Sequence, residues 1–399
     1  MKQMKKKINS HFLFTLLSFF IPLTVYLLTM APTTSFWDCG EFIACSVTLG
    51  VPHPPGTPLF LLLGNVFSHL PTFQDIGARV NLMSPIASAF SVMFLYLIVV
   101  LLLNRLNNNK TEQKKIIEYC AFIAALTFAV TDSHWFNVVE SEVYALSTFF
   151  TSIVVWLALK WDEKPFNENS IKYLILISYM MGLAIGIHIL NLLAIPCILF
   201  ILFYNKTRSN QLSNIDYKKL FKEILYLGFL SFMIFGVIYL VIIKGIPNLG
   251  DSLQSLWVPI IIYISVFIIT YYLIKINNNQ LATIFTCIAM ILIGYSTYST
   301  IFIRASQHPS INENSPDTPT EFLSYINRDQ YGSVNSFDPV SAIQNSSHGH
   351  WKRYINPPDN ISQQTNPKKF KKEYELKKNN PSLSETIDFV LRYQINEMY

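Results

Sequence analysis

Long apolar runs separated by short polar connections are the dominant pattern along this chain. Each run approaches the roughly 20 residues that an α-helix needs to cross a bilayer. The pattern predicts an all-α, polytopic membrane protein with about nine transmembrane helices. The expected spans cover residues 12–30, 82–103, 119–130, 144–159, 173–187, 190–204, 224–243, 256–274 and 282–303. A further apolar run at 59–66 is too short to cross and is expected to lie in or against the membrane.

Basic residues are distributed unequally between the two sides of these spans. With a cytoplasmic amino terminus, the cytoplasmic connections hold 17 Lys and Arg residues, whereas the opposite connections before the tail hold three. This asymmetry follows the positive-inside rule and therefore predicts a cytoplasmic amino terminus. The first span follows four lysines and lacks a small-residue cleavage site, so we interpret it as a retained signal anchor rather than a cleaved signal peptide.

The carboxyl-terminal residues differ in composition from the rest of the chain. Residues 306–399 are rich in Asn, Ser, Pro and Lys, include a charged run at 368–378, and show only weak helical periodicity near 383–395. Such a composition is typical of a partly ordered, solvated segment. We therefore expect two parts, a transmembrane domain over 1–305, whose first external loop covers 31–81, and a polar extracytoplasmic tail.

Composition supports a membrane protein and argues against several other classes. Hydrophobic residues make up 51% of the 399 residues and charged residues 14%, compared with roughly 25% charged residues in an average soluble protein. The net charge of +5 arises mainly from short connections and does not indicate nucleic-acid binding. The five cysteines lack metal-ligand spacing, and the chain has no Gly-x-x-x-x-Gly-Lys loop for a nucleotide.

The first external loop carries the strongest candidate chemistry. Asp38 and Glu41 follow the first span by a few residues and would share one face of a helix. Partial desolvation beside the membrane would raise the pKa of such a carboxylate and suit it to accept a proton. The sequence His53-Pro54-Pro55-Gly56 is stiff at its prolines and permissive at its glycine, which predicts a loop of fixed shape.

A second acidic cluster, Glu140 and Glu142, lies in the short external connection before the span at 144–159. Because both clusters face the same side of the membrane, we expect them to form one shared site. Spacing alone also allows a simpler interpretation, in which each carboxylate caps a helix amino terminus or faces water.

These segments resemble a known family. They resemble domain-of-unknown-function family 2723, which is placed among the GT-C membrane glycosyltransferases and is similar to protein O-mannosyltransferases. The resemblance implies a helical bundle of GT-C type that transfers a sugar, expected to be mannose, from polyprenyl phosphate to Ser or Thr of proteins on the non-cytoplasmic face. It extends over about residues 30–332, with matching segments at 37–42, 53–56, 140–145, 186–191 and 322–332.

The resemblance also implies roles for the acidic residues. Asp38 would act as the base that deprotonates the acceptor hydroxyl, and the transfer would invert the anomeric carbon. Glu41 would orient Asp38 or the acceptor, and Glu142 would help to position the sugar. The other neighbouring residues expected to bind substrate are Trp37, Glu140 and Tyr144.

Departure of the lipid phosphate requires a cation, because negative charge builds on it in the transition state. Arg304, at the outer end of the last span, is the main candidate, and His53 and His188 are secondary ones. The alternative for Arg304 is an interfacial arginine whose stem lies along apolar surface. The alternative for both histidines is a hydrogen-bonded structural role. A divalent metal stays open as a cofactor.

The chain departs from the family pattern at two places. Asn312 stands where the pattern has an acidic residue, which weakens a metal or sugar role at that position. Members of the family are expected to be longer, and residues 392–399 resemble the start of a further segment. We therefore expect an incomplete tail, and an inactive truncated chain is an alternative.

Two other functions stay open at this stage. A transferase of the same fold could act on envelope lipid or polysaccharide instead of protein. A transporter or lipid exporter is less consistent with the pattern, because transporters usually place ionisable groups near the middle of the membrane or in internal repeats. The expected partners are membrane lipids, a polyprenyl-phosphate sugar and an acceptor protein, in a bacterial inner membrane.

Overall fold

A computed structural model describes residues 9–107, 113–163, 168–208 and 217–331, and this part of the chain is helical. It contains no β-strand within those ranges, apart from an isolated bridge between Val51 and Asn312. Contacts divide the chain into two compact units, Met1–Asn327 and Arg328–Tyr399. The second unit is described only over 328–331, so the order and helical periodicity expected for most of the tail lie outside the described residues.

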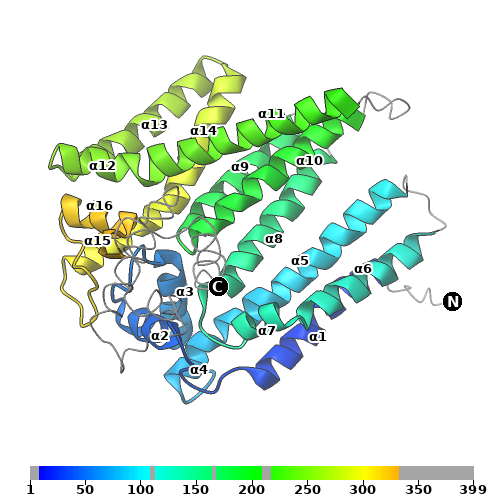
Figure 1. Cartoon of the computed structure of the whole chain (residues 1–399), viewed down its shortest axis with the longest axis horizontal. Helices are drawn as coiled ribbons and strands as arrows, with labels where there is room; N and C mark the ends of the chain where they lie inside the picture. The colour runs from blue at the N-terminus through cyan, green and yellow to red at the C-terminus, as the bar shows by residue number, and fades with distance from the viewer. Residues whose placement is uncertain (1–8, 108–112, 164–167, 209–216, 332–399) are drawn as a thin grey trace, which may run out of the picture. The chain divides into compact units, whose positions relative to one another are not determined.

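The first unit combines long helices with short ones (Figure 1). The elements before the middle of the chain are α1 Ser10–Thr29, α2 Cys39–Thr48, α3 Pro58–Ser68, α4 Ile76–Asn81, α5 Met83–Leu106, α6 Lys114–Ala129, α7 Asp132–Val138, α8 Val143–Asp162 and α9 Glu168–Ile185. They are followed by η2 Ile189–Leu193, α10 Ala194–Arg208, α11 Tyr217–Gly236, η3 Val237–Ile243, α12 Gly245–Ser252, α13 Trp257–Lys275, α14 Asn279–Tyr295, η4 Ser296–Tyr298, α15 Ser299–Ala305 and α16 Pro319–Asn327. A short 3-10 turn, η5 Asp329–Tyr331, belongs to the second unit.

Each expected span coincides with helical structure, and the multi-pass organisation is confirmed. Six helical segments are long and apolar enough to cross a membrane, and a seventh is obtained if α6 and α7, which are bent by 65°, count as one span. The helices at 173–187 and 190–204 belong to a shorter class in the described residues. The number nine therefore stays a prediction, as does the orientation of the termini.

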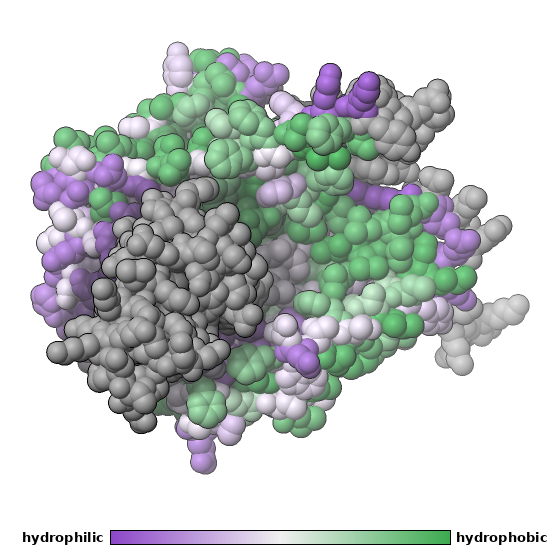
Figure 2. Space-filling model, viewed as in Figure 1, coloured by the Kyte–Doolittle hydropathy of each residue, from purple (hydrophilic) through white to green (hydrophobic). Residues whose placement is uncertain are grey.

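The long helices expose a large apolar surface. Figure 2 shows hydrophobic side chains gathered over them, with hydrophilic side chains toward the margins. Phe232, Leu240 and Ile268 are 71%, 62% and 61% exposed. Apolar side chains at this exposure would be unfavourable in water over so wide an area, and a surrounding lipid phase accounts for them.

The short helices α2, α3 and α4 lie together at one end of the long helices (Figure 1). The apolar run at 59–66 forms most of α3, an 11-residue helix that is too short to span, as expected. Residues after the last span also pack against this loop, since the backbone N–H of Val51 donates to Ile311 and that of Glu313 donates to Val51. The first compact unit thus continues to Asn327, beyond the change of composition at 306.

Two glycines allow α9 and α14 to approach each other closely. A Cβ atom added at Gly182 would lie 2.4 Å from the carbonyl oxygen of Ile291, and one added at Gly294 would lie 2.4 Å from the backbone nitrogen of Leu183. Such backbone contact between helices is typical of membrane bundles. Because lipid is as apolar as the side chains, the hydrophobic effect does not drive these helices together, and small residues allow close van der Waals packing instead. This pair positions the end of α9, which leads to the candidate site.

Replacing Gly294 with Ala should destabilise the protein by about 1–3 kcal/mol, because the added methyl group would separate α9 from α14. Thermal unfolding in detergent would measure the change. Gly228→Ala is the matched control, since nothing lies within 4 Å of its added Cβ, and it should leave stability unchanged or slightly higher. Equal unfolding temperatures for the two variants would contradict this packing.

Candidate active site

The amino terminus of α2 presents two of the expected acidic residues. Asp38 is the N-cap residue of α2, but its side chain forms no capping hydrogen bond, and Glu41 lies in the first helical turn. The side chain of Asp38 is 57% exposed, so the desolvation expected for this carboxylate is not found. Trp37, which precedes it, is 82% exposed and has a φ of 59°. Asp38 is therefore reachable from solvent rather than used to stabilise the helix.

The loop after α2 is held in one shape by two tyrosines that lie far along the chain. The hydroxyl of Tyr325 donates to the carbonyl of Pro52 at 2.6 Å, and that of Tyr298 donates to the carbonyl of Gly56 at 3.4 Å. Gly56 has a φ of 76°, and an added Cβ would lie 2.6 Å from the Tyr325 hydroxyl, so this position requires glycine. These contacts fix the backbone that carries His53.

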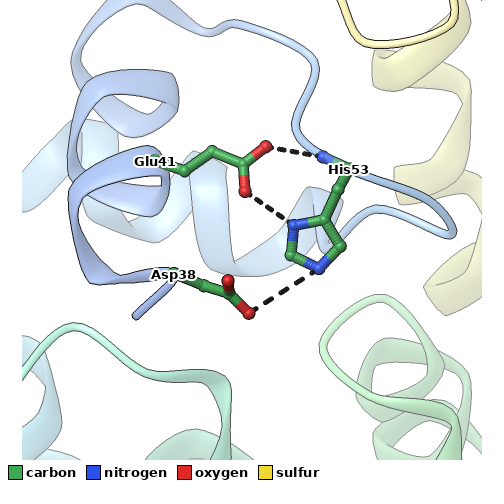
Figure 3. Close-up of side chains that lie close together, drawn as sticks. All are labelled: Asp38, Glu41 and His53. Carbon is green, nitrogen blue, oxygen red and sulfur yellow. Dashed lines mark hydrogen bonds and ion pairs between the residues drawn. The ribbon is translucent and has the colours of Figure 1, made fainter. Parts of the chain in front are cut away.

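His53 joins the two carboxylates of α2 (Figure 3). Its backbone N–H donates to Glu41 Oε1 at 2.7 Å, its Nδ1 lies 2.6 Å from Glu41 Oε2, and its Nε2 lies 3.9 Å from Asp38 Oδ2. Burial acts to raise the pKa of Glu41, but the side-chain and backbone hydrogen bonds from His53 and its charge lower the pKa below its ordinary value. Glu41 is thus an ionised acceptor that orients the imidazole toward Asp38.

Asn81, at the end of α4, connects this loop to the second acidic cluster. Its amide nitrogen donates to the carbonyls of Ala31 and Thr33, at 2.9 and 2.8 Å. Its amide oxygen accepts the hydroxyl of Ser141 at 2.5 Å and is contacted by the thiol of Cys39 at 3.8 Å. Because Cys39 follows Asp38 and Ser141 lies between Glu140 and Glu142, one buried amide brings both clusters together.

Glu140 and Glu142 are the buried acids of this site. Only 7% of Glu142 and 3% of Glu140 are exposed. Burial, followed by the negative charges of Asp38 and Glu140, raises the pKa of Glu142 from 4.5 to about 7. The effect of Asp38 on Glu142 agrees with the expectation that the two clusters lie in one site. The carboxylate poised to exchange a proton near neutral pH is therefore Glu142, a property that spacing in the sequence did not predict.

Tyr144 and His188 form a contact beside this cluster. Their ring centroids are 5.5 Å apart. Tyr144 lies in the first turn of α8, two residues after Glu142, and is 44% exposed. The Nδ1 atom of His188 accepts a hydrogen bond from the backbone of Leu190, which matches the structural interpretation for this histidine. The pair presents aromatic surface next to the acids.

Arg304 lies at the other end of α2. Its Nε donates to the carbonyl of Leu49 at 2.8 Å and its Nη2 to that of Thr48 at 3.0 Å. The guanidinium thus neutralises carbonyls at the carboxyl terminus of α2, while Asp38 is at the amino terminus. Ten residues of helical rise separate those ends by roughly 15 Å. The structure therefore does not bring Arg304 to the acidic cluster.

The residues that the sequence analysis missed are uncharged and position the charged ones. Asn81, Tyr298 and Tyr325 position the loop and the acids, but only Tyr325 fell within a segment singled out by resemblance. An Asn directly before an apolar span was a signal that could have identified Asn81, since an amide near the membrane needs hydrogen-bond partners.

Glu142→Gln should raise the thermal stability of the protein at pH 8 by up to about 3 kcal/mol. The pKa is higher in the folded state, so the wild-type protein loses stability as pH rises from 4.5 to about 7. The gain should be much smaller at pH 5, where the folded wild type is protonated. Glu313→Gln, at an exposed carboxylate, is the control and should change stability by less than about 0.5 kcal/mol. A pH-independent effect of Glu142→Gln would contradict its raised pKa.

Comparisons with known proteins find similarity over the segment that carries most of these residues. The family model described as the N-terminal domain of the protein O-mannosyl-transferase TMEM260 matches residues 38–211. That segment contains Asp38, Glu41, His53 and Glu142, but not Arg304. No solved structure matches the chain.

Two curated relatives carry the same name. The protein O-mannosyl-transferase tmem260 of Dictyostelium discoideum is 27% identical over 192 residues, which cover 45% of this chain and 22% of that protein. The protein of the same name from Mus musculus is 28% identical over 186 residues, which cover 46% of this chain and 25% of that protein. The chain thus spans about a quarter of the length of these relatives. The similarities support a protein O-mannosyltransferase-like family.

Proposed function

We propose that this chain is the membrane part of a glycosyltransferase that moves mannose from a polyprenyl-phosphate carrier to Ser or Thr of a protein. The site faces the non-cytoplasmic side of a bacterial inner membrane, and the amino terminus is cytoplasmic. The observation that carries the proposal is the convergence of Asp38, Glu41, His53, Glu140 and Glu142 beside one rigid loop. The relatives' printed name supports the reaction class.

Asp38 is the proposed base. Its exposed carboxylate can meet an acceptor that approaches from outside the membrane. The acceptor oxygen forms a bond to the anomeric carbon, its proton passes to Asp38, and the bond from that carbon to the phosphate oxygen breaks. Polyprenyl phosphate leaves with the electron pair, and the anomeric centre is inverted. Glu41 orients the pair of His53 and Asp38 through its two hydrogen bonds.

The sugar is proposed to bind between the acids and the aromatic pair. Glu142 is buried and near its midpoint of protonation at neutral pH, so it can accept or donate a hydrogen bond to a sugar hydroxyl. Trp37 is exposed, and Tyr144 with His188 supplies a second aromatic surface. Aromatic faces beside carboxylates are suited to the apolar and polar faces of a pyranose ring.

An apolar cavity of about 510 Å³ is consistent with a donor that carries a lipid chain. It is lined almost entirely by apolar side chains of α12, α13, α14 and the segment after it, including Tyr263, Ile264 and Phe267. Tyr298 and Phe322 also line it, and Tyr298 bonds to the carbonyl of Gly56. The cavity is therefore connected, through one side chain, to the loop that holds His53. We propose that it holds the first isoprenoid units of the carrier.

Asp38→Asn should reduce sugar transfer to an acceptor peptide at least a hundredfold, because an amide cannot take the hydroxyl proton. The assay uses purified protein, a labelled polyprenyl-phosphate sugar and a Ser/Thr peptide. Asp132→Asn, at an exposed aspartate in α7, should retain activity. Full activity of Asp38→Asn would exclude it as the base, and label found in lipid or polysaccharide instead of peptide would change the acceptor class.

Ile264→Trp should raise the KM for a long-chain donor severalfold while leaving kcat nearly unchanged, because indole would fill part of the cavity. A donor with a very short lipid chain should be affected less. Ile268→Trp, on the same helix but outside the cavity lining, is the matched control. Equal KM values for the two variants would show that the lipid chain lies elsewhere.

A further inference from the structure

The pairing of Glu41 with His53 determines which face of the imidazole meets Asp38. An ionised carboxylate only accepts hydrogen bonds, so Nδ1 of His53 must carry the proton in its 2.6 Å contact with Glu41 Oε2. Nε2 therefore faces Asp38 Oδ2 across 3.9 Å, too far for a hydrogen bond. A histidine that binds a metal through one ring nitrogen usually donates the N–H of its other ring nitrogen to a carboxylate. Glu41 is placed to accept such a hydrogen bond from Nδ1 of His53, which leaves Nε2 toward Asp38.

The spacing of these atoms suits a divalent cation. One ligand atom from each of Asp38, Glu41 and His53 lies within 4.8 Å of the others. Neighbouring ligands at about 2.2 Å from an octahedral cation are roughly 3.1 Å apart. Asp38 Oδ2 and His53 Nε2, at 3.9 Å, therefore need to approach by roughly 0.8 Å. Because Asp38 is exposed and uncapped, its side chain can make this adjustment.

The surroundings carry uncompensated negative charge. Glu140 is 3% exposed, and its Oε1 atom has no hydrogen-bond partner among the described residues. It lies close enough to act electrostatically on both Glu142 and the thiol of Cys39, next to Asp38. In the described part of the chain, no Lys or Arg forms an ion pair with a carboxylate of either acidic cluster, which are those of Asp38, Glu41, Glu140 and Glu142. A buried acceptor without a donor is uncommon, and an ordered water or an ion would satisfy it.

We propose that Asp38 and Nε2 of His53 ligate a divalent cation of the Mn²⁺ class, with Glu41 orienting the imidazole. Mixed carboxylate and imidazole ligands, with open positions for water, suit Mn²⁺ better than Ca²⁺ or Mg²⁺. Binding stands on this geometry alone, whereas a role in catalysis rests on the proposed function. There the cation would neutralise the leaving phosphate, the task for which Arg304 is not placed, and the second oxygen of Asp38 would remain for the proton.

The test is a titration of the purified, metal-stripped protein with Mn²⁺, in which calorimetry measures the affinity and electron paramagnetic resonance identifies the ligands. We expect one ion per chain and an electron spin echo modulation from a directly bound nitrogen. His53→Ala should abolish the nitrogen signal and weaken affinity at least tenfold. Asp38→Asn should weaken it similarly without disturbing the fold, since Asp38 caps nothing. Glu41→Gln should weaken it about tenfold through loss of orientation.

His69→Ala is the matched control, because His69 lies at the end of α3 and bonds to Asn65; it should bind Mn²⁺ as the wild type does. Absence of binding by folded wild-type protein, or binding unchanged by both His53→Ala and Asp38→Asn, would overturn the site. The outcome is separable from the transferase assay. Binding without sugar transfer would uphold the site and reject the function, and transfer by metal-free protein would uphold the function and reject the catalytic role of the cation.

Discussion

The arrangement of the candidate site depends on the buried amide of Asn81. Its two N–H groups and its oxygen are all engaged, with the carbonyls of Ala31 and Thr33 on one side and with Ser141 and Cys39 on the other. Asn81 is completely buried, and each partner left unsatisfied would cost about 1–3 kcal/mol. The segment after the first helix, the start of α2 and the connection before α8 are therefore held in one register.

This constraint determines the electrostatics of the site. By placing Ser141 beside Cys39, it brings Glu140 and Glu142 toward Asp38, although a hundred residues of chain separate the clusters. The tyrosines that hold the loop at Pro52 and Gly56 then fix His53 between Glu41 and Asp38. His53 contacts Asp38 and Glu41 and interacts electrostatically with Glu142. This negative charge favours a bound cation, and an anionic phosphate substrate would also require a cation at the site.

The sequence was informative where the signal is local. Apolar run length predicted the helices because a span must match the bilayer. The expectation that both loops lie on one side of the membrane led to the hypothesis that the two acidic clusters share one site. Burial was not predictable from the sequence, since it depends on packing among distant segments. The sequence predicted partial desolvation of Asp38, but Asp38 is exposed and Glu142 is the buried carboxylate of the two. Arg304 was likewise misplaced because its carbonyl partners lie 255 and 256 residues away.

The central claim is that both acidic clusters form one site, and the titration of Glu142 tests it most directly. Infrared difference spectra, with Glu142→Gln as the reference, would give the midpoint of this carboxyl in the wild type and in Asp38→Asn. Because the charge of Asp38 contributes to the raised pKa of Glu142, the midpoint should start near pH 7 and fall in the Asp38→Asn protein. An identical midpoint in both proteins would mean that the clusters do not interact.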